Sequence, residues 1–280
     1  MSLRTILAGI FVLAVAGAAA AASPCDPQAT ETATLAEIND QGDLVLADGR
    51  ALRLAGILMR QSTPALMRGR LDPPTELRFR ALAGEPDRWG RIDAQVLFPD
   101  ESQGDAVQAV ALGRGDRTVD LGGEAPYTLQ QWLVDLGEAR VAPGLSSPEP
   151  PPPCLRFLFG REELARGAER GLWRDTATAI RSADDPDAIL DDLGHFAVVE
   201  GTVTSVGDRK RMIYLNFGTE WTRDFTVTIL KNSRTRLVRV GLDLAGLKGK
   251  RVRVRGLVEA NRGPFIEVVA PEQIEVVGAE

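Results

Sequence analysis

The sequence predicts a mainly β protein with flanking helices (α+β), arranged as two small β-barrels. Leucines fall on alternate positions on both sides of Asp48-Gly49, a dipeptide that takes a positive φ without strain and closes a tight hairpin. Short alternating segments return from residue 196 to the end of the chain. The stretches between these two regions show a helical period instead.

The first barrel is predicted from the hairpin at residues 44–57 and a second alternating segment at 87–98. Asp87, Arg88 and Arg91 place charge at the mouth of the second segment, where a β-barrel rim would meet a ligand. Between the two segments, Pro73-Pro74 followed by Thr75 predicts the start of a helix, with the nearby arginines on its solvated face. A short apolar run at 106–112 indicates one more strand.

Two helices are expected after this barrel. Residues 127–136 place leucines and Trp132 on one face, and Trp132 is interpreted as a core residue. A proline-rich extended stretch at 148–153 leads into a second helix at 154–173. Arginines and glutamates, Glu162 and Glu163 among them, alternate along this helix, which is typical of a solvated face with internal ion pairs.

The N-terminal segment has the layout of a secretory signal. Arg4 precedes an apolar run at 6–16 and a tract of small residues at 18–22, so residues 1–22 are predicted to be removed. A membrane anchor is the alternative, although the apolar part is shorter than the roughly 20 residues that span a bilayer. We therefore expect a periplasmic or secreted protein with no membrane attachment after signal removal.

Export changes how the cysteines are interpreted. Cys25 and Cys154 are the two cysteines of the chain, and an oxidising compartment favours a disulfide between them. Two unpaired thiols are the alternative. A catalytic cysteine is disfavoured because the single histidine, His195, lies in the second domain and is interpreted as a polar residue at the domain junction.

The chain divides into a first domain at 30–175, an acidic linker at 176–194 and a second domain at 195–280. Residues 194–280 carry 14 Lys+Arg and 10 Asp+Glu, whereas the whole chain has 33 and 39. The first half is therefore acidic and repels a polyanion at long range, which disfavours tight non-specific nucleic-acid binding through that half.

Short strands are predicted in the second domain at 196–206, 212–217, 225–230, 251–258, 264–269 and 274–277. With a helix-like segment at 236–247, they would form a small Greek-key barrel of the OB type, a fold that often binds single strands through basic grooves and stacking aromatics. The candidate ligand contacts are Lys210, Arg211, Tyr214, Trp221, Arg223, Lys231, Arg253 and Arg255. The alternative is that the arginines form the outer face of an amphipathic strand and that Trp221 covers one end of the barrel.

Several pieces of the first half, in order, carry a resemblance. They are Asp40-Gln41-Gly42-Asp43, Arg53-Leu54-Ala55-Gly56-Ile57, Asp87-Arg88-Trp89-Gly90-Arg91, the segment 133–141 and the helix ending in Gly171-Leu172-Trp173. Together they resemble the thermonuclease (staphylococcal nuclease-like) family over residues 32–173. The resemblance implies a first barrel of the staphylococcal-nuclease type, and the second domain resembles small OB-fold modules.

The resemblance also implies a chemistry. Members of that family cleave phosphodiesters. They use a calcium ion held by two aspartates, a glutamate that activates or positions water, and two arginines that contact the phosphate. Arg53 and Arg91 match the arginines, and Trp89 is the aromatic residue beside them, a candidate substrate contact.

The carboxylates of that family do not match this chain. Gly42, Leu58 and Gln61 stand at their positions, and Asp43 is displaced by one residue, which turns its side chain to the other face of a strand. Ca²⁺ prefers several oxygen ligands including charged carboxylates, so we expect a damaged or absent metal site.

Three functional classes follow from these features. The first is a catalytically degenerate thermonuclease-like monomer with a binding or assembly role, weakly involving single-stranded nucleic acid. The second is a structural envelope module without a nucleic-acid role. The third is an active endonuclease in which Asp40, Asp43 and Asp87 rebuild a Ca²⁺ site, and this is the only class that needs a cofactor. We rank the classes in that order.

Overall fold

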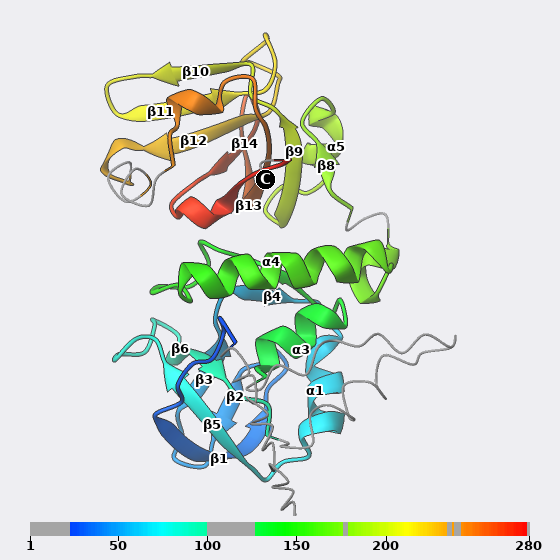
Figure 1. Ribbon diagram of the computed structural model, residues 1–280, viewed down its shortest axis with the longest axis vertical. Coiled ribbons are helices and arrows are strands. Elements are labelled where there is room, and N and C mark those ends of the chain that lie inside the picture. The colour runs from blue at the N-terminus through cyan, green and yellow to red at the C-terminus, as the bar shows by residue number, and fades with distance from the viewer. Residues whose placement is uncertain (1–22, 100–126, 176–178, 234–236, 238–241, 279–280) are drawn as a thin grey trace, which may run out of the picture.

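The computed structural model describes residues 23–99, 127–175, 179–233, 237 and 242–278. Two β units lie at opposite ends of the molecule, and a long helix, α4, runs between them (Figure 1). The predicted signal segment, the predicted strand at 106–112 and part of the predicted helix at 236–247 lie outside the described residues. Within them, no helix has the length and apolar character that crossing a membrane requires.

The first unit is a closed five-stranded barrel with the strand order β1-β2-β3-β6-β5. Gly49 takes φ +89 in the β2–β3 turn, as the hairpin prediction requires. Strands β3 and β6 run parallel, so that Arg53 lies opposite Asp93. The strands are β1 Glu31–Ile38, β2 Leu44–Leu46, β3 Ala51–Leu54, β5 Thr75–Ala81 and β6 Arg91–Val96, and a short sheet pairs β4 Ile57–Met59 with β7 Ala139–Val141.

The predicted helix beginning at Pro73-Pro74 is wrong. The helix α1 (Thr63–Leu71) ends before the prolines, with Asp72 in the left-handed region at φ 45, and the chain then enters β5. Leu77 and Phe79 are fully buried in the barrel, whereas Arg78 and Arg80, which alternate with them, are exposed. The segment therefore has the period of two that a strand needs, which two consecutive prolines obscured.

Two helices close the first unit. Thr128 caps α3 (Leu129–Asp135) in a reciprocal capping box with Gln131, and Trp132 is buried as predicted. Helix α4 (Pro152–Gly167) is followed by a short 3₁₀ turn, η1 (Gly171–Arg174).

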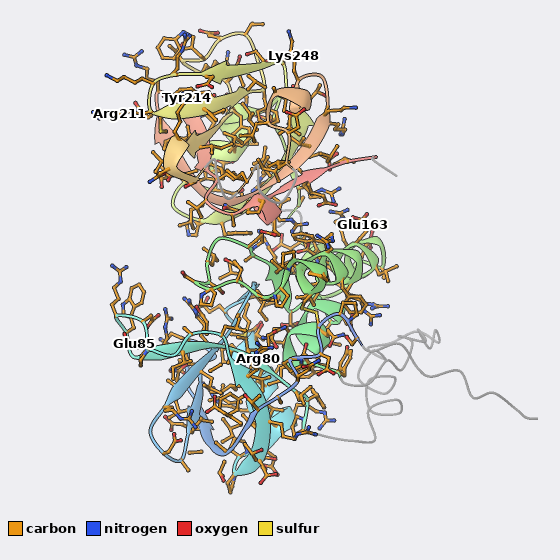
Figure 2. The ribbon with its side chains drawn as sticks, turned by 60° about the vertical axis from the view of Figure 1, so that its left-hand side comes forward. Arg80, Glu85, Glu163, Arg211, Tyr214 and Lys248 are labelled. Atoms are coloured by element: carbon orange, nitrogen blue, oxygen red, sulfur yellow. A yellow bond between two sulfur atoms is a disulfide. The ribbon has the colours of Figure 1, made fainter. Side chains whose placement is uncertain are left out.

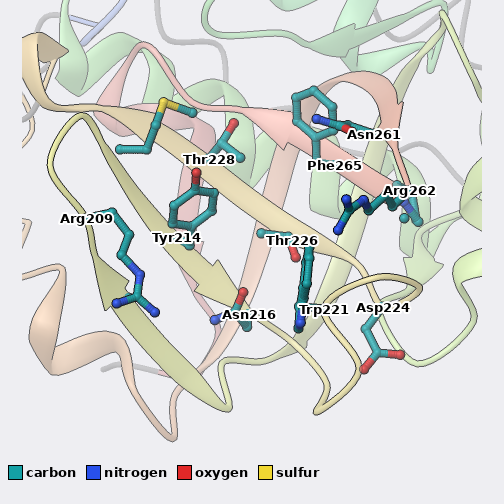
Figure 3. A pocket seen from close by; sticks show the side chains of 14 residues that line it. Arg209, Tyr214, Asn216, Trp221, Asp224, Thr226, Thr228, Asn261, Arg262 and Phe265 are labelled. Atoms are coloured by element: carbon teal, nitrogen blue, oxygen red, sulfur yellow. The ribbon is translucent and has the colours of Figure 1, made fainter.

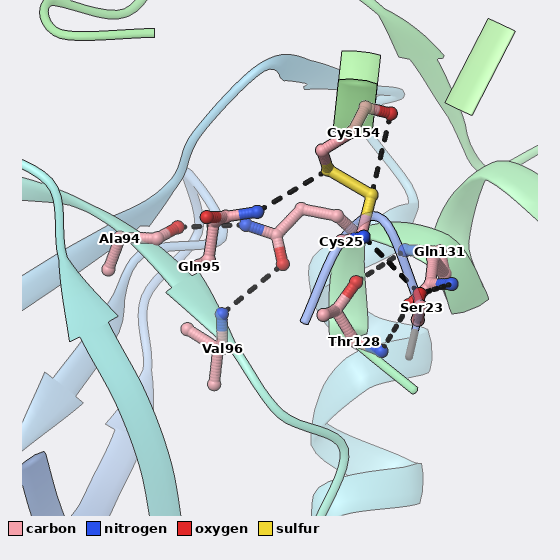
Figure 4. The surroundings of a disulfide bond; sticks show 9 residues. Ser23, Cys25, Ala94, Gln95, Val96, Thr128, Gln131 and Cys154 are labelled. Carbon is pink, nitrogen blue, oxygen red and sulfur yellow. Dashed lines mark hydrogen bonds between the residues drawn. A yellow bond between two sulfur atoms is a disulfide. The ribbon is translucent and has the colours of Figure 1, made fainter. Parts of the chain in front are cut away.

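The predicted disulfide between Cys25 and Cys154 is confirmed. It joins the first described residues to the start of α4, where Gln95 also donates a hydrogen bond to the Cys154 sulfur at 3.4 Å (Figure 4). The bridge spans 129 residues of sequence, and in the chain-entropy model a loop of that size contributes about 4 to 5 kcal/mol.

The second unit is an eight-stranded sheet with the order β10-β11-β12-β14-β13-β9-β8, in which β15 also pairs with β13. All the strands predicted from residue 196 onward are present. Its strands are β8 Arg181–Ser182, β9 Phe196–Thr202, β10 Ser205–Asp208, β11 Met212–Asn216, β12 Thr226–Leu230, β13 Arg251–Asn261, β14 Gly263–Glu267 and β15 Ile274–Val276. Two 3₁₀ turns, η3 Ala245–Leu247 and η4 Pro271–Gln273, belong to the same unit.

Part of the predicted acidic linker belongs to the second unit. Strand β8 pairs in parallel with β9, and the short helix α5 (Pro186–Leu190) starts at a side-chain cap from Asp185. Ile189 of α5 is fully buried in the core of the second sheet. The segment therefore packs as structure from residue 181 onward.

A buried ion pair joins the two units. Arg255 of β13 lies 2.5 Å from Glu162 of α4, and their side chains are 2% and 1% exposed. Glu162 also accepts a hydrogen bond from the Val141 backbone N–H at 3.0 Å. The expectation that Glu162 belongs to a solvated helix face is wrong, because this face of α4 is covered by the second sheet.

A shell of further pairs surrounds this contact. Arg253 lies 2.8 Å from Glu200 and 3.3 Å from Glu163, which Figure 2 labels on α4 at the boundary between the units. Apolar contact continues beside the charges, where Ala142 of the first unit packs with Phe196 and Val198. The two units therefore meet through both buried charge and buried apolar surface.

We predict that Glu162→Ala destabilises the protein by about 3 to 5 kcal/mol, because the buried Arg255 guanidinium then loses its 2.5 Å partner and keeps only a longer contact of 3.6 Å with Glu275. Chemical denaturation gives the free energy of unfolding. Glu163→Ala is the control, since the Glu163 side chain is 58% exposed and its loss should cost at most about 1 kcal/mol. Equal effects of the two substitutions would contradict a dominant buried pair.

Candidate ligand-binding groove

The second unit carries a groove of about 630 Å³ on the face of its sheet formed by β10, β11, β12 and β14 (Figure 3). Most of the side chains that line it are of three kinds: aromatic rings, guanidinium groups, and small amides and hydroxyls. They are Tyr214, Trp221 and Phe265; Arg209 and Arg262; and Asn216, Asn261, Thr226 and Thr228. Flat apolar surfaces and hydrogen-bonding groups are thus combined in one concave site.

Strand alternation places these side chains on one face. Along β11, Ile213 and Leu215 point into the core, whereas Tyr214 and Asn216 point outward into the groove. Tyr214 pairs with Thr228 of β12, and Asn216 pairs with Thr226. The groove floor therefore consists of two neighbouring rows that cross the strands.

The loop between β11 and β12 presents Trp221. The Asp224 carboxylate accepts a hydrogen bond from the Glu220 backbone N–H at 2.6 Å and so closes the loop on itself. Gly218 is required here, because a Cβ at this position would lie 1.9 Å from the Asp224 carboxylate. The closed loop holds Trp221 with 64% of its surface exposed at the edge of the groove.

The turn between β13 and β14 presents Arg262. The backbone of this residue takes φ +75, a conformation that residues other than glycine rarely adopt. Its guanidinium stands 4.9 Å from the centre of the Trp221 ring, within cation–π range. Gly263 allows the turn to approach the neighbouring loop, since a Cβ there would lie 2.7 Å from the Arg223 carbonyl oxygen.

Some of the residues predicted as ligand contacts come together here. Tyr214 and Trp221 line the groove, and Lys210 and Arg211 occupy the β10–β11 turn next to Arg209. Arg253 and Arg255 lie instead in the buried junction with the first unit.

The remaining candidates of the second half form other contacts. Lys231 pairs with Asp208 at 2.5 Å, and Arg223 lies 3.7 Å from Asp187. His195 is exposed before β9, with its Nδ1 3.1 Å from the Leu193 carbonyl oxygen.

In the first barrel, the two arginines predicted to contact phosphate are each paired with a carboxylate. Arg53 forms a bidentate pair with Asp93, with distances of 2.6 and 2.8 Å, and the hydrogen bond to Asp93 raises the pKa of the guanidinium. Arg91 pairs with Asp87 at 2.9 Å. Although burial acts to raise it, hydrogen bonds from Arg91 and Trp89 lower the pKa of Asp87 to about 2.

Trp89 stands at the tip of the β5–β6 loop. The Asp87 carboxylate accepts hydrogen bonds from the backbone N–H groups of Trp89 and Arg91, which fixes the turn. The Trp89 ring is 62% exposed and lies 3.9 Å from the guanidinium carbon of Arg88 and 4.8 Å from that of Arg91. This tip is a single exposed ring beside two cations, whereas the groove of the second unit combines three rings.

The three aspartates considered for a metal site are engaged separately. Asp40 pairs with Arg68 at 2.6 Å, Asp43 accepts a hydrogen bond from the Asn39 side chain at 3.0 Å, and Asp87 pairs with Arg91. Across the described part of the chain, no three His, Cys, Asp or Glu side chains are grouped as a metal site. The structure does not bring Asp40, Asp43 and Asp87 together.

Comparisons with known proteins do not identify a relative: no family model matches the sequence, and no curated protein is significantly similar to it.

A buried carboxyl group lies where the two units meet. Glu149 accepts hydrogen bonds from the backbone N–H groups of Gly144 and Ser146 at 2.7 and 3.2 Å, and its Oε2 is buried with no partner among the described residues. Burial raises the pKa of Glu149 to about 7, and the nearby Glu272 and Asp93 act in the same direction. The Gly144 end of this loop packs against Gln273 of the second unit.

We predict that Glu149 makes the free energy of unfolding fall as pH rises from about 4.5 to 7. In that window the unfolded chain has released the proton that the folded protein still holds, so the folded state loses stability with a slope of at most about 1.4 kcal/mol per pH unit. Glu149→Gln should flatten this part of the pH profile, as measured by denaturation at several pH values. The exposed Glu85→Gln is the control, and a Glu149→Gln profile parallel to the wild type would refute the assignment.

Proposed function

We propose that this protein is an exported, catalytically degenerate thermonuclease-like protein that binds single-stranded nucleic acid through the groove of its second unit. The observation that carries the proposal is the set of three aromatic rings, Tyr214, Trp221 and Phe265, with two arginines on one face of a sheet. Stacking rings in a basic groove are the usual means of binding single strands. The proposal takes the eight-stranded sheet as an OB-type barrel.

The spacing of the rings favours a single strand over a duplex. Tyr214 lies on β11 and Phe265 on β14, with β12 between them, so the two rings are separated by roughly 10 Å from the usual distance between strands. Bases along one strand of a duplex are stacked about 3.4 Å apart. Two neighbouring bases that each stack on one of these rings are therefore too far apart to stack on each other. Only an unpaired strand can separate its bases in this way.

The charges of the groove agree with a polyanionic ligand. Arg209 and Arg262 line it, and Lys210 and Arg211 are adjacent in the β10–β11 turn. Asp224 is the one acidic lining residue, and its carboxylate is engaged with the backbone of its own loop. A ligand phosphate thus meets arginine side chains at the edge of the groove.

Two features support binding without cleavage. Gly42, Leu58 and Gln61 stand where the resemblance would require carboxylates, and neither the main chain of Gly42 nor a neutral side chain replaces a charged ligand for Ca²⁺. Arg53 and Arg91 are held by Asp93 and Asp87, so a phosphate would have to displace a paired carboxylate in each case.

Export is supported by the disulfide between Cys25 and Cys154, because such bonds persist in oxidising compartments. The composition of residues 1–22 agrees with it. The acidic first unit and the buried contacts between the units also suit a structural envelope module, and that alternative predicts no binding of nucleic acid at all.

We predict that the oxidised protein binds a single-stranded oligonucleotide and that Trp221→Ala weakens this binding roughly 5- to 100-fold, the usual effect of removing one stacking ring. Fluorescence anisotropy at fixed salt measures the dissociation constant. Arg262→Ala should also reduce the dependence of log Kd on log salt by about 0.7, because one phosphate contact is lost.

Trp89→Ala is the matched control, since this tryptophan is as exposed as Trp221 and also lies against an arginine, but on the first unit. It should leave the affinity unchanged. Loss of affinity in Trp89→Ala with no loss in Trp221→Ala would move the binding site to the first barrel. A duplex bound as tightly as the single strand would contradict the stacking model.

We predict no calcium-dependent cleavage of single-stranded DNA or RNA, because the carboxylates that would hold the ion are missing. The assay compares the protein with Ca²⁺, the protein with chelator, and the double variant Arg53→Ala/Arg91→Ala. Cleavage that requires Ca²⁺ and disappears in the double variant would show that the site has been rebuilt from other carboxylates.

A further inference from the structure

The floor of the groove contains a polar atom without a partner. Thr228 lies in the middle of β12 with a relative exposure of 7%, and within the described part of the chain its Oγ1 makes no hydrogen bond. Buried hydroxyl groups are nearly always hydrogen-bonded, and an exception in a native protein calls for an explanation. Here the exception lines a candidate binding site.

Thr228 is placed to meet a group that lies on Tyr214. The two residues are direct cross-strand partners of β11 and β12, and their side chains point to the same face (Figure 3). Such partners have Cβ atoms about 4.5 to 5.5 Å apart. A flat ring stacked on Tyr214 therefore has one of its edges over the Thr228 hydroxyl.

The neighbours of Thr228 on its own face are side chains of the groove region. Thr228 is flanked by Tyr214 on one neighbouring strand, by Glu267 on the other, and by Thr226 along its own strand. Because Tyr214 and Thr228 both line the groove, a group that stacks on Tyr214 lies beside the Thr228 hydroxyl.

Building on the proposed function, we propose that Thr228 is a base-contacting residue whose hydroxyl hydrogen-bonds the edge of the base stacked on Tyr214. A hydroxyl group both donates and accepts, so it can serve a keto or an amino group on that edge. The groove then senses the base itself, and binding depends on base identity in addition to charge and stacking.

The test measures dissociation constants for four DNA homopolymers of equal length and for an abasic strand. Thr228→Val keeps the shape and removes the hydroxyl, and it should weaken binding of the best homopolymer about tenfold while leaving the abasic strand unaffected. Thr228→Ser should restore most of the affinity. Thr202→Val is the matched control: Thr202 is an exposed threonine of β9 that does not line the groove, so the loss of its hydroxyl should leave the affinity unchanged.

A second readout separates binding from structure. Removing an unpaired buried hydroxyl relieves a desolvation cost, so Thr228→Val should leave the melting temperature unchanged or raise it while affinity falls. Lower stability together with weaker binding of every strand, abasic included, would show a structural role and overturn the inference. If the wild type binds and Thr228→Val binds equally well, the inference about Thr228 is overturned but the proposed function stands. If the wild type binds no strand, both are overturned.

Discussion

The arrangement of the molecule depends on the buried ion pair between Arg255 and Glu162. Charges that are almost completely removed from water are tolerated only when they are paired, so burial of this contact requires that Glu162 of α4 meets Arg255 of β13. The same helix is tied at its start by the Cys25–Cys154 disulfide. Helix α4 is therefore fixed at two points along its length, and the barrel and the second sheet are held in one orientation.

Arg53 of the first unit and Arg262 of the second differ in how they are held. In the first barrel, Arg53 forms a bidentate pair with Asp93 and donates a hydrogen bond to the Leu145 carbonyl oxygen. Its guanidinium group is therefore engaged in contacts within the fold. In the second unit, Arg262 stands over an exposed ring at the edge of a groove. Binding an anion at Arg53 requires breaking existing contacts, whereas binding beside Arg262 adds contacts to a stacking surface. This difference in pairing is why the proposed anion contacts are placed at Arg262 and not at Arg53.

The period of two in the sequence was enough to predict the strands of the second unit from residue 196 onward and β2, β3 and β6 of the barrel, and Asp48-Gly49 was enough to place one hairpin. The prediction was wrong at β5. Leu77 and Phe79 alternate with arginines there, as in a strand, but Pro73-Pro74 was interpreted as the start of a helix. The Glu162–Arg255 pair could not be predicted, because an alternating charge pattern looks the same on a solvated helix and on one covered by a distant strand. Of the groove, the aromatic residues Tyr214 and Trp221 were predictable, whereas Arg262 was not, since its position depends on a turn conformation.

Two local features of the groove work against stability. Arg262 occupies a left-handed conformation that costs on the order of 1 kcal/mol or more for a residue with a side chain, and Thr228 buries a hydroxyl with no partner. A sheet shaped for stability alone would have glycine at the turn and valine on the strand, as β12 has at Val227. Both costs fall on residues that line one groove, beside exposed aromatic rings. Unfavourable features concentrated in this way are typical of a surface shaped for a ligand, and they support placing the proposed binding site on the second unit.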